Sequence, residues 1–194
     1  MSTDKKYLRG TRNINPAFTL HKIGQYAHKK AQETEVGKQL EIMTALLMCG
    51  LTLEALLNDV GYSIFVLKKR EIELWNAIER LSPRKKLDVI AEKLCINIDF
   101  GSIPFQNFSQ IFKYRDFIVH GKYCQIIKEV EVNKIEIDDL QNIDGFQEKW
   151  EKQTTIKNIE KWRKSVSDIS EILTQKAELP NMLQIAGYQE WSIF

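Results

Sequence analysis

Residues 37–61 read GKQLEIMTALLMCGLTLEALLNDVG and contain the most apolar stretch of the chain, Ile42–Leu57. Leucine, isoleucine and methionine recur here at three- and four-residue steps on more than one side of the expected helix. A helix that is apolar on most of its surface belongs in the middle of a bundle. The stretch therefore predicts an all-α fold built around one central helix.

Further helices are expected before and after this segment, from helix-start residues and from apolar positions at helical spacing. They run from Asn15-Pro16 into the thirties, over about residues 68–81, from Ser82-Pro83 to Leu94, from Phe105 to Gly121, and from Ile156 to Leu173. Between Tyr123 and Ile137 apolar and charged residues roughly alternate, which predicts a short extended or β-hairpin excursion. The expected architecture is an up-and-down bundle of four to six helices.

The 194 residues suit one domain with two flanking parts. The expected parts are a basic N-terminal arm with the first helix (1–35), a helical domain (36–177) and a C-terminal tail (178–194). Seven Lys or Arg residues between Met1 and Lys30 stand against the single acid Asp4, whereas the whole chain carries a net charge of only +2. The arm could contact phosphates or simply be a solvated basic segment. Trp191 and Phe194 in the tail should dock on another surface or remain disordered.

Several classes of protein are disfavoured by what the sequence lacks. Cys49, Cys95 and Cys124 have no CxxC spacing and are expected to be reduced core thiols. No zinc-ligand spacing, phosphate-binding loop or nucleophile elbow occurs, so neither a metal nor a cofactor is expected. The charged N-terminus has no apolar signal region, and Thr44, Thr52 and Glu54 interrupt the most apolar stretch. A cytoplasmic protein without a membrane span is therefore expected.

One residue breaks the apolar pattern of the helix that begins at Phe105. Phe108, Phe112 and Val119 continue a stripe of three- and four-residue steps, and Arg115 occupies the slot that completes it. A guanidinium at a core-facing position is costly unless it is paired or faces a partner, so this position indicates a site or an interface.

Asp116 and His120 are four residues apart, and the carboxylate could therefore orient the imidazole for general acid-base chemistry. Arg115 and His120 diverge by about 140° on one helix, so a second copy across a two-fold axis would help to bring both groups to one cleft. A structural interpretation stays open: Arg115 could pair with Glu54, Asp116 could be a surface residue, and His120 could favour the helix C-terminus.

The stretch Arg115-Asp116-Phe117-Ile118-Val119-His120 resembles the R-x4-H motif of the HEPN superfamily, in which a polar residue follows the arginine. Upstream, Leu53-Glu54-Ala55-Leu56-Leu57-Asn58 resembles the LEAxxN stretch on the long early helix of many HEPN proteins. The two segments together extend the resemblance over roughly residues 38–175, with the helices in the expected order.

The resemblance implies a metal-independent endoribonuclease of the toxin or antiviral defence type. In such an enzyme the ribose 2′-hydroxyl attacks the adjacent phosphorus to give a 2′,3′-cyclic phosphate. The implied catalytic residues are Arg115, Asp116 and His120, the supporting residues are Glu54 and Asn58, and the RNA-contact candidates are Lys113, Lys122 and Tyr123. The implied partners are RNA, a second copy of the chain and an antitoxin or defence protein.

Two further interpretations belong to the resemblance. Many HEPN domains are not catalytic and serve as dimerisation, nucleotide-binding or partner-binding modules, which is the alternative for this chain. Some HEPN toxins carry a modified tyrosine two residues after the motif histidine. Here Tyr123 follows His120 by three residues, so this regulation is not expected. Glu54 and Asn58 could also be a buried polar pair that satisfies neighbouring helices.

Overall fold

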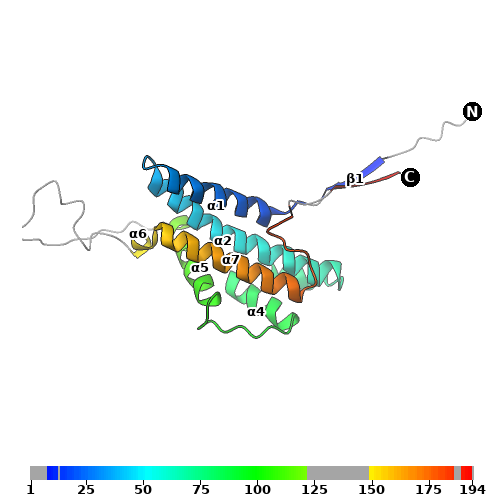
Figure 1. Ribbon diagram of the computed structural model, residues 1–194. Coiled ribbons are helices and arrows are strands. Elements are labelled where there is room, and N and C mark those ends of the chain that lie inside the picture. Colours follow the sequence, from blue (N-terminus) through cyan, green and yellow to red (C-terminus); the bar gives the residue numbers. More distant parts are fainter. Residues whose placement is uncertain (1–7, 13, 122–148, 186–188, 194) are drawn as a thin grey trace, which may run out of the picture.

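The computed structural model describes residues 8–12, 14–121, 149–185 and 189–193, and within these residues the chain is mostly helical (Figure 1). The predicted all-α bundle is thus confirmed, with five longer and two short α-helices in the described part. They are α1 (Pro16–Glu33), α2 (Lys38–Tyr62), α3 (Ile72–Ile78), α4 (Pro83–Lys93), α5 (Phe105–Val119), α6 (Lys149–Gln153) and α7 (Ile156–Lys176). A π-helical turn, η1 (Ser63–Leu67), continues α2.

The central position of α2 is the organising feature of the bundle. This helix contacts α1, α4, α5 and α7, and Figure 1 shows it running beside α7 with α1 on one side and α4 and α5 on the other. Leu46, Leu53 and Leu57 are fully buried. These four helices together cover the apolar surface that residues 37–61 predicted. A helix that is apolar on nearly every side needs neighbours on all of those sides, because any uncovered side would expose apolar surface to water.

The segment Lys38–Leu67 is long and apolar enough to cross a membrane. Its most apolar 18 residues have a mean hydropathy of 1.8, and half of them are buried inside the bundle. The expectation that no segment reaches this length and composition was therefore wrong. The polar interruptions do not lower the hydropathy enough, because leucine dominates the residues around them. The core helix of a bundle has the same composition, so this property alone assigns no membrane.

Small residues let α1 approach α2 closely. The buried positions of α1 are Ala17, Gly24, Ala27 and Ala31. A Cβ added to Gly24 would lie 3.0 Å from the Cβ of Met48 on α2, so a larger residue there would push the two helices apart. The first helix therefore belongs to the same hydrophobic core as the rest, and this core extends from Ala17 to Leu183. The boundaries expected near residues 35 and 177 do not divide it.

The tail docks on the start of α1. Asn15 caps this helix by accepting a hydrogen bond from the Phe18 amide (3.1 Å), and its Nδ2 donates to the carbonyl oxygens of Met182 (2.6 Å) and Ile185 (2.8 Å). Further out, β1 (Leu8–Arg12) pairs antiparallel with β2 (Gln189–Ile193), so that these two strands, from opposite ends of the sequence, lie side by side (Figure 1). Of the two outcomes expected for the tail, residues 181–185 therefore show docking, on the start of α1.

Three details differ from the expectations. The helix predicted over residues 68–81 is confined to α3, because η1 continues α2 and the chain then turns at Arg70, whose φ is 59°. Val119 is exposed rather than part of the buried stripe, since α5 ends at this residue. Cys95 is exposed rather than a core thiol, whereas Cys49 is buried. The excursion expected near 123–137 and the residues Lys122, Tyr123 and Cys124 lie outside the described residues.

Candidate functional site

The helix that carries the motif is fixed on two sides by buried side chains. Phe105, Phe108 and Ile111 of α5 enter the core. Two polar contacts then lock the helix in rotation: Asn107 donates to Ser165 Oγ on α7 (2.8 Å), and the Tyr114 hydroxyl lies 3.1 Å from Thr154 Oγ1. These contacts place Arg115 against α2 and leave the opposite side of the last turns of α5 in solvent.

Arg115 lies flat in the junction between α5 and α2. Its side chain is 15% exposed, and its guanidinium lies over the Phe112 ring, 4.9 Å from the ring centroid. The stem of Arg115 runs along Gly50 of α2, where an added Cβ would lie 3.1 Å from the Arg115 Cβ and 3.3 Å from its Cδ. The glycine therefore makes room for the arginine. Sequence reasoning missed this role of Gly50, because no local pattern shows which residue of α5 it faces.

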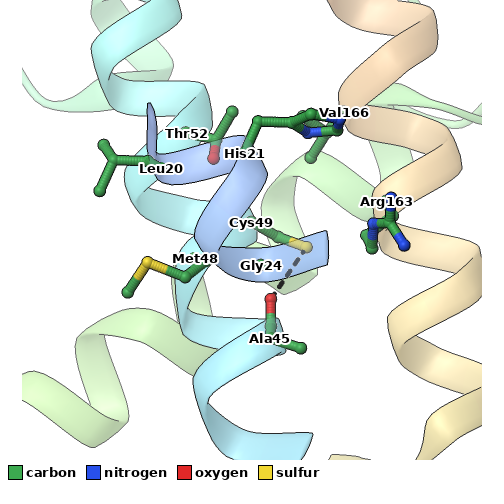
Figure 2. Close-up of a pocket in the computed structure, with 9 residues that line it drawn as sticks. All are labelled: Leu20, His21, Gly24, Ala45, Met48, Cys49, Thr52, Arg163 and Val166. Carbon is green, nitrogen blue, oxygen red and sulfur yellow. Dashed lines mark hydrogen bonds between the residues drawn. The ribbon is translucent and has the colours of Figure 1, made fainter. Parts of the chain in front are cut away.

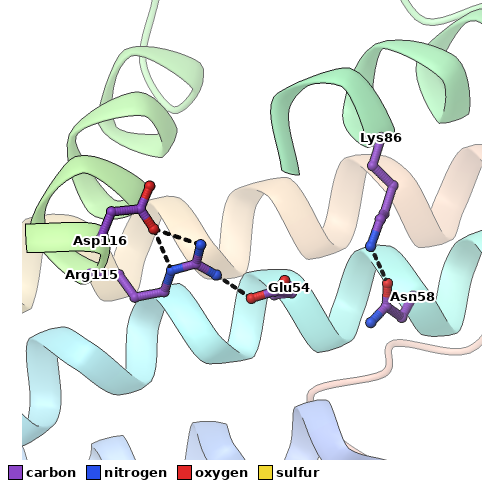
Figure 3. Close-up of polar contacts among 5 residues, drawn as sticks. All are labelled: Glu54, Asn58, Lys86, Arg115 and Asp116. Atoms are coloured by element: carbon purple, nitrogen blue, oxygen red, sulfur yellow. Dashed lines mark hydrogen bonds and ion pairs between the residues drawn. The ribbon is translucent and has the colours of Figure 1, made fainter. Parts of the chain in front are cut away.

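Two carboxylates hold the Arg115 guanidinium (Figure 3). Nη1 donates to Glu54 Oε2 in a short ion pair, while Nε and Nη2 donate to Asp116 Oδ1 at 2.9 and 2.6 Å. The structure thus brings together Glu54 and Arg115, the pair that the structural interpretation of the sequence named. A guanidinium has five N–H donors, so two remain for another acceptor, one on each Nη nitrogen.

His120 lies at the end of α5 and caps it. Its backbone N–H donates to the Asp116 carbonyl oxygen (3.0 Å), and its side chain is exposed. Within the described residues, the imidazole has no hydrogen bond, and the predicted contact from the Asp116 carboxylate is not formed. This expectation was wrong for the single chain: Asp116 turns toward the adjacent guanidinium, whose Nε and Nη2 both donate to Asp116 Oδ1. Arg115 lies against α2, whereas the His120 side chain is exposed.

Asn58 has a partner that the sequence did not indicate. Lys86 of α4 is 2% exposed and donates to Asn58 Oδ1 at 2.5 Å (Figure 3). Burial lowers the pKa of Lys86, and the nearby Glu54 and Glu79 carboxylates oppose that shift. Asn58 is therefore a structural group that holds a buried lysine. Lys86 was missed because it follows Arg84 and Lys85 in a run that is typical of a solvated helix face.

Lys113 is the remaining RNA-contact candidate among the described residues, and it is exposed on α5. Near it, Phe117 stacks on Trp150 of α6 with 5.9 Å between ring centroids and 27° between the ring planes. The other candidates, Lys122 and Tyr123, lie outside the described residues. The site as described therefore consists of a half-buried ion-pair cluster facing α2 and an exposed face at the end of α5.

A second polar cluster lies between α1, α2 and α7, away from the motif (Figure 2). Its cavity has room for about one water molecule, ≈ 10 Å³, and His21, Thr52 and Arg163 are among the residues that line it. Burial, reinforced by the charges of Arg163 and Lys22, lowers the pKa of His21 to about 4. Burial also raises the pKa of the Cys49 thiol to about 12, so this cysteine is no nucleophile at neutral pH.

Neither metal chemistry nor relatives add a further assignment. Among the described residues, no three His, Cys, Asp or Glu side chains gather into a set that could hold a metal ion. Comparison of the chain with protein-family models, with curated proteins and with solved structures gives no significant match. A function for this protein therefore has to be inferred from its own residues.

Proposed function

We propose that this protein is a metal-independent endoribonuclease of the HEPN type, which acts as a homodimer. The observation that carries the proposal is the contrast between the two motif residues. Arg115 is held in one orientation by Glu54 and Asp116, whereas the His120 imidazole is exposed and has no hydrogen bond within the described residues. Structural histidines usually have partners, while a group that must exchange protons with a substrate needs access to it.

The proposed reaction needs only groups that this chain and its RNA supply. His120 takes the proton of a ribose 2′-hydroxyl, whose oxygen forms a bond to the adjacent phosphorus. The bond from phosphorus to the 5′-oxygen breaks, and that oxygen receives the proton that His120 has taken up, which leaves a 2′,3′-cyclic phosphate, a free 5′-hydroxyl and the imidazole in its starting state. Arg115 uses its remaining N–H groups on the phosphate oxygens and so stabilises the charge of the transition state. Asp116 and Glu54 are the positioning residues that hold the guanidinium.

The first test is cleavage of single-stranded RNA in excess EDTA. We expect undiminished activity with EDTA and a loss of at least about 100-fold in His120→Ala, since general acid-base catalysis contributes about 10² to 10⁴ in rate. His28→Asn on α1 is the matched control, and it should keep its activity. Strict dependence on a divalent ion, or full activity of His120→Ala, would contradict the proposal.

The homodimer is tested by complementation. The divergence of about 140° between Arg115 and His120 on one helix is eased when a two-fold axis brings two copies of each residue together. Chains of Arg115→Gln and His120→Ala should therefore regain part of their activity when they are unfolded and refolded together. A sample that sediments wholly as a monomer at assay concentration and yet cleaves RNA fully would rule out the shared site.

The second candidate function is a non-catalytic HEPN module that dimerises or binds a nucleotide or protein partner. The charge balance at Arg115 favours it, because two carboxylates already neutralise the guanidinium. This candidate predicts that His120→Ala leaves every measured binding property unchanged. The first proposal also includes a cytoplasmic role in a toxin–antitoxin or antiviral module, with an antitoxin or defence protein as partner. It predicts that expression of the protein with the intact motif arrests growth.

A further inference from the structure

One exposed face of α5 carries a cation, an aromatic ring and an imidazole in a row. Lys113, Phe117 and His120 follow one another at steps of four and three residues, which places them on the same side of the helix. All three are exposed, whereas Ile111, Phe112 and Tyr114 on the other sides are buried. The row spans about 10 Å along the helix axis at ~1.5 Å per residue.

The aromatic ring in this row is a fixed surface. Phe117 is 38% exposed, and its ring stacks on Trp150 at 5.9 Å. Trp150 is itself anchored, because its carbonyl oxygen accepts a hydrogen bond from Thr154 Oγ1 (2.8 Å), and Thr154 in turn contacts the Tyr114 hydroxyl on α5 (3.1 Å). Two helices that are far apart in the sequence thus cooperate to hold a partly exposed phenyl ring. Core packing alone requires no such exposure, whereas a stacking platform does.

The charges around the platform suit a nucleotide. Lys113 lies about one helical turn before Phe117 and can contact a phosphate, while His120 lies three residues after it. Asp116 directly precedes Phe117, and its carboxylate is engaged by two hydrogen bonds from Arg115 (2.9 and 2.6 Å). Together, a cation, a π-face and a proton-transferring group offer a partner for the phosphate, the base and the ribose of a nucleotide.

We propose that this face is a subsite for one unpaired nucleotide of RNA, whose base stacks on Phe117 while Lys113 contacts its phosphate. The inference rests on the proposed ribonuclease function and adds a binding requirement, which is one unpaired base at this face. Duplex RNA does not fit, because a base inside a helix already has neighbours on both π-faces. Stacking on one ring tolerates every base, so the subsite confers a requirement for an unpaired base and little sequence preference.

The test measures binding in a His120→Ala background, where RNA stays intact. The probe is a fluorescently labelled single-stranded oligoribonucleotide of mixed sequence, followed by anisotropy. Phe117→Leu should weaken binding by about 5- to 150-fold, the range expected for loss of one stacked base. Phe117→Tyr should bind like the parent because it keeps the ring. Tyr26→Leu on α1, another exposed aromatic, is the control and should not change affinity.

Two further probes separate stacking from charge. An oligomer with abasic sites should bind the parent as weakly as the intact oligomer binds Phe117→Leu, and a blunt RNA duplex should not respond to the Phe117 variants. Equal binding of Phe117→Leu and the parent, or equal binding of intact and abasic oligomers, would overturn the subsite. A change of sedimentation in Phe117→Leu would also overturn it, since the face would then belong to a contact between two copies.

Failure of the subsite and failure of the proposed function give different results. If His120→Ala abolishes cleavage while Phe117→Leu leaves binding unchanged, the ribonuclease stands and the subsite falls. If no variant or condition shows cleavage while Phe117→Leu still weakens binding, the subsite stands in a non-catalytic RNA-binding protein.

Discussion

The contact between Glu54 and Arg115 allows a quantitative prediction, because it joins the two segments that carry the family resemblance. The perturbation is a double-mutant cycle of Glu54→Gln, Arg115→Gln and the combination. Glu54→Gln keeps the size of the side chain and removes its charge, so the guanidinium retains only Asp116. Arg115→Gln removes the cation and its contact with the Phe112 ring, which lies 4.9 Å from the guanidinium.

The expected coupling follows from the exposure of the two side chains, which is 15% for Arg115 and 37% for Glu54. Fully exposed ion pairs contribute about 0–1 kcal/mol, and breaking a fully buried pair costs about 3–5 kcal/mol. A pair between these limits should show a coupling free energy of about 1–2 kcal/mol. The pair Lys93–Glu71 is the matched control, since its side chains are 33% and 37% exposed and its coupling should stay below about 1 kcal/mol.

The assay is urea unfolding of the four proteins of each cycle at pH 7, at low salt and at about 1 M NaCl, where charges are screened beyond roughly 3 Å. The Lys93–Glu71 coupling should largely vanish in salt, whereas most of the Glu54–Arg115 coupling should remain. On the functional side, Arg115→Gln should lower RNA cleavage by about 10²-fold or more, and Glu54→Gln by less than about tenfold, because Asp116 still holds the guanidinium. A Glu54–Arg115 coupling no larger than that of the control pair would refute the reasoning.

Three predictions concern stability. Gly61→Ala should lower the free energy of unfolding by about 1–3 kcal/mol in urea melts, because the new Cβ would lie 2.2 and 2.4 Å from atoms of the buried Trp75 ring; Gly121→Ala, with no neighbour nearer than 3.6 Å, should not. Burial raises the pKa of Asp59 to about 6 from 3.8, so the folded state binds the proton more tightly and gains stability as pH falls from 6 toward 4. Asp59→Asn should therefore be more stable at pH 7 by roughly 1 kcal/mol, after allowance for solvent exposure, and lose this advantage near pH 4. The pKa of His21 is instead lowered from 6.5 to about 4, so the unfolded state binds the proton more tightly and the folded state loses stability as pH falls from 6.5 toward 4. In thermal melts, His21→Gln should not show this loss of stability.

Much of the fold could be predicted from local patterns. The starts at Asn15-Pro16 and Ser82-Pro83 were placed correctly, because a capping residue followed by proline is a signal that depends on neighbours in the chain alone. The extent of α3 could not be predicted. The chain leaves the helical path at Arg70 with a φ of 59°, and a non-glycine residue adopts this conformation only where the surrounding structure imposes it.

The site was predicted in part for the same reason. Arg115 stands out because it interrupts an apolar stripe, and Glu54 because it is an acid on an apolar helix, so their pairing follows from complementary charge. Lys86 could not be found in this way, since it lies 28 residues from Asn58 and its neighbours Arg84 and Lys85 are both exposed. The partner of the Asp116 carboxylate could not be predicted either. The spacing of four residues places Asp116 beside His120, but it does not show that the flexible Arg115 side chain can fold back to reach the same carboxylate.

The position of Asp116 connects the ion-pair cluster to the proposed chemistry. In the free chain one cation faces two carboxylates, so an approaching phosphate meets a local excess of negative charge. Glu54 is the less exposed of the two acids, with 37% against 52% for Asp116, and it is held between α2 and α5. Under the proposed function, the phosphate oxygens accept from the two N–H groups that remain, one on each Nη nitrogen, while Glu54 and Asp116 hold the guanidinium. The two carboxylates thus orient the cation and at the same time oppose the phosphate, and solvent screens that opposition more effectively at the more exposed Asp116.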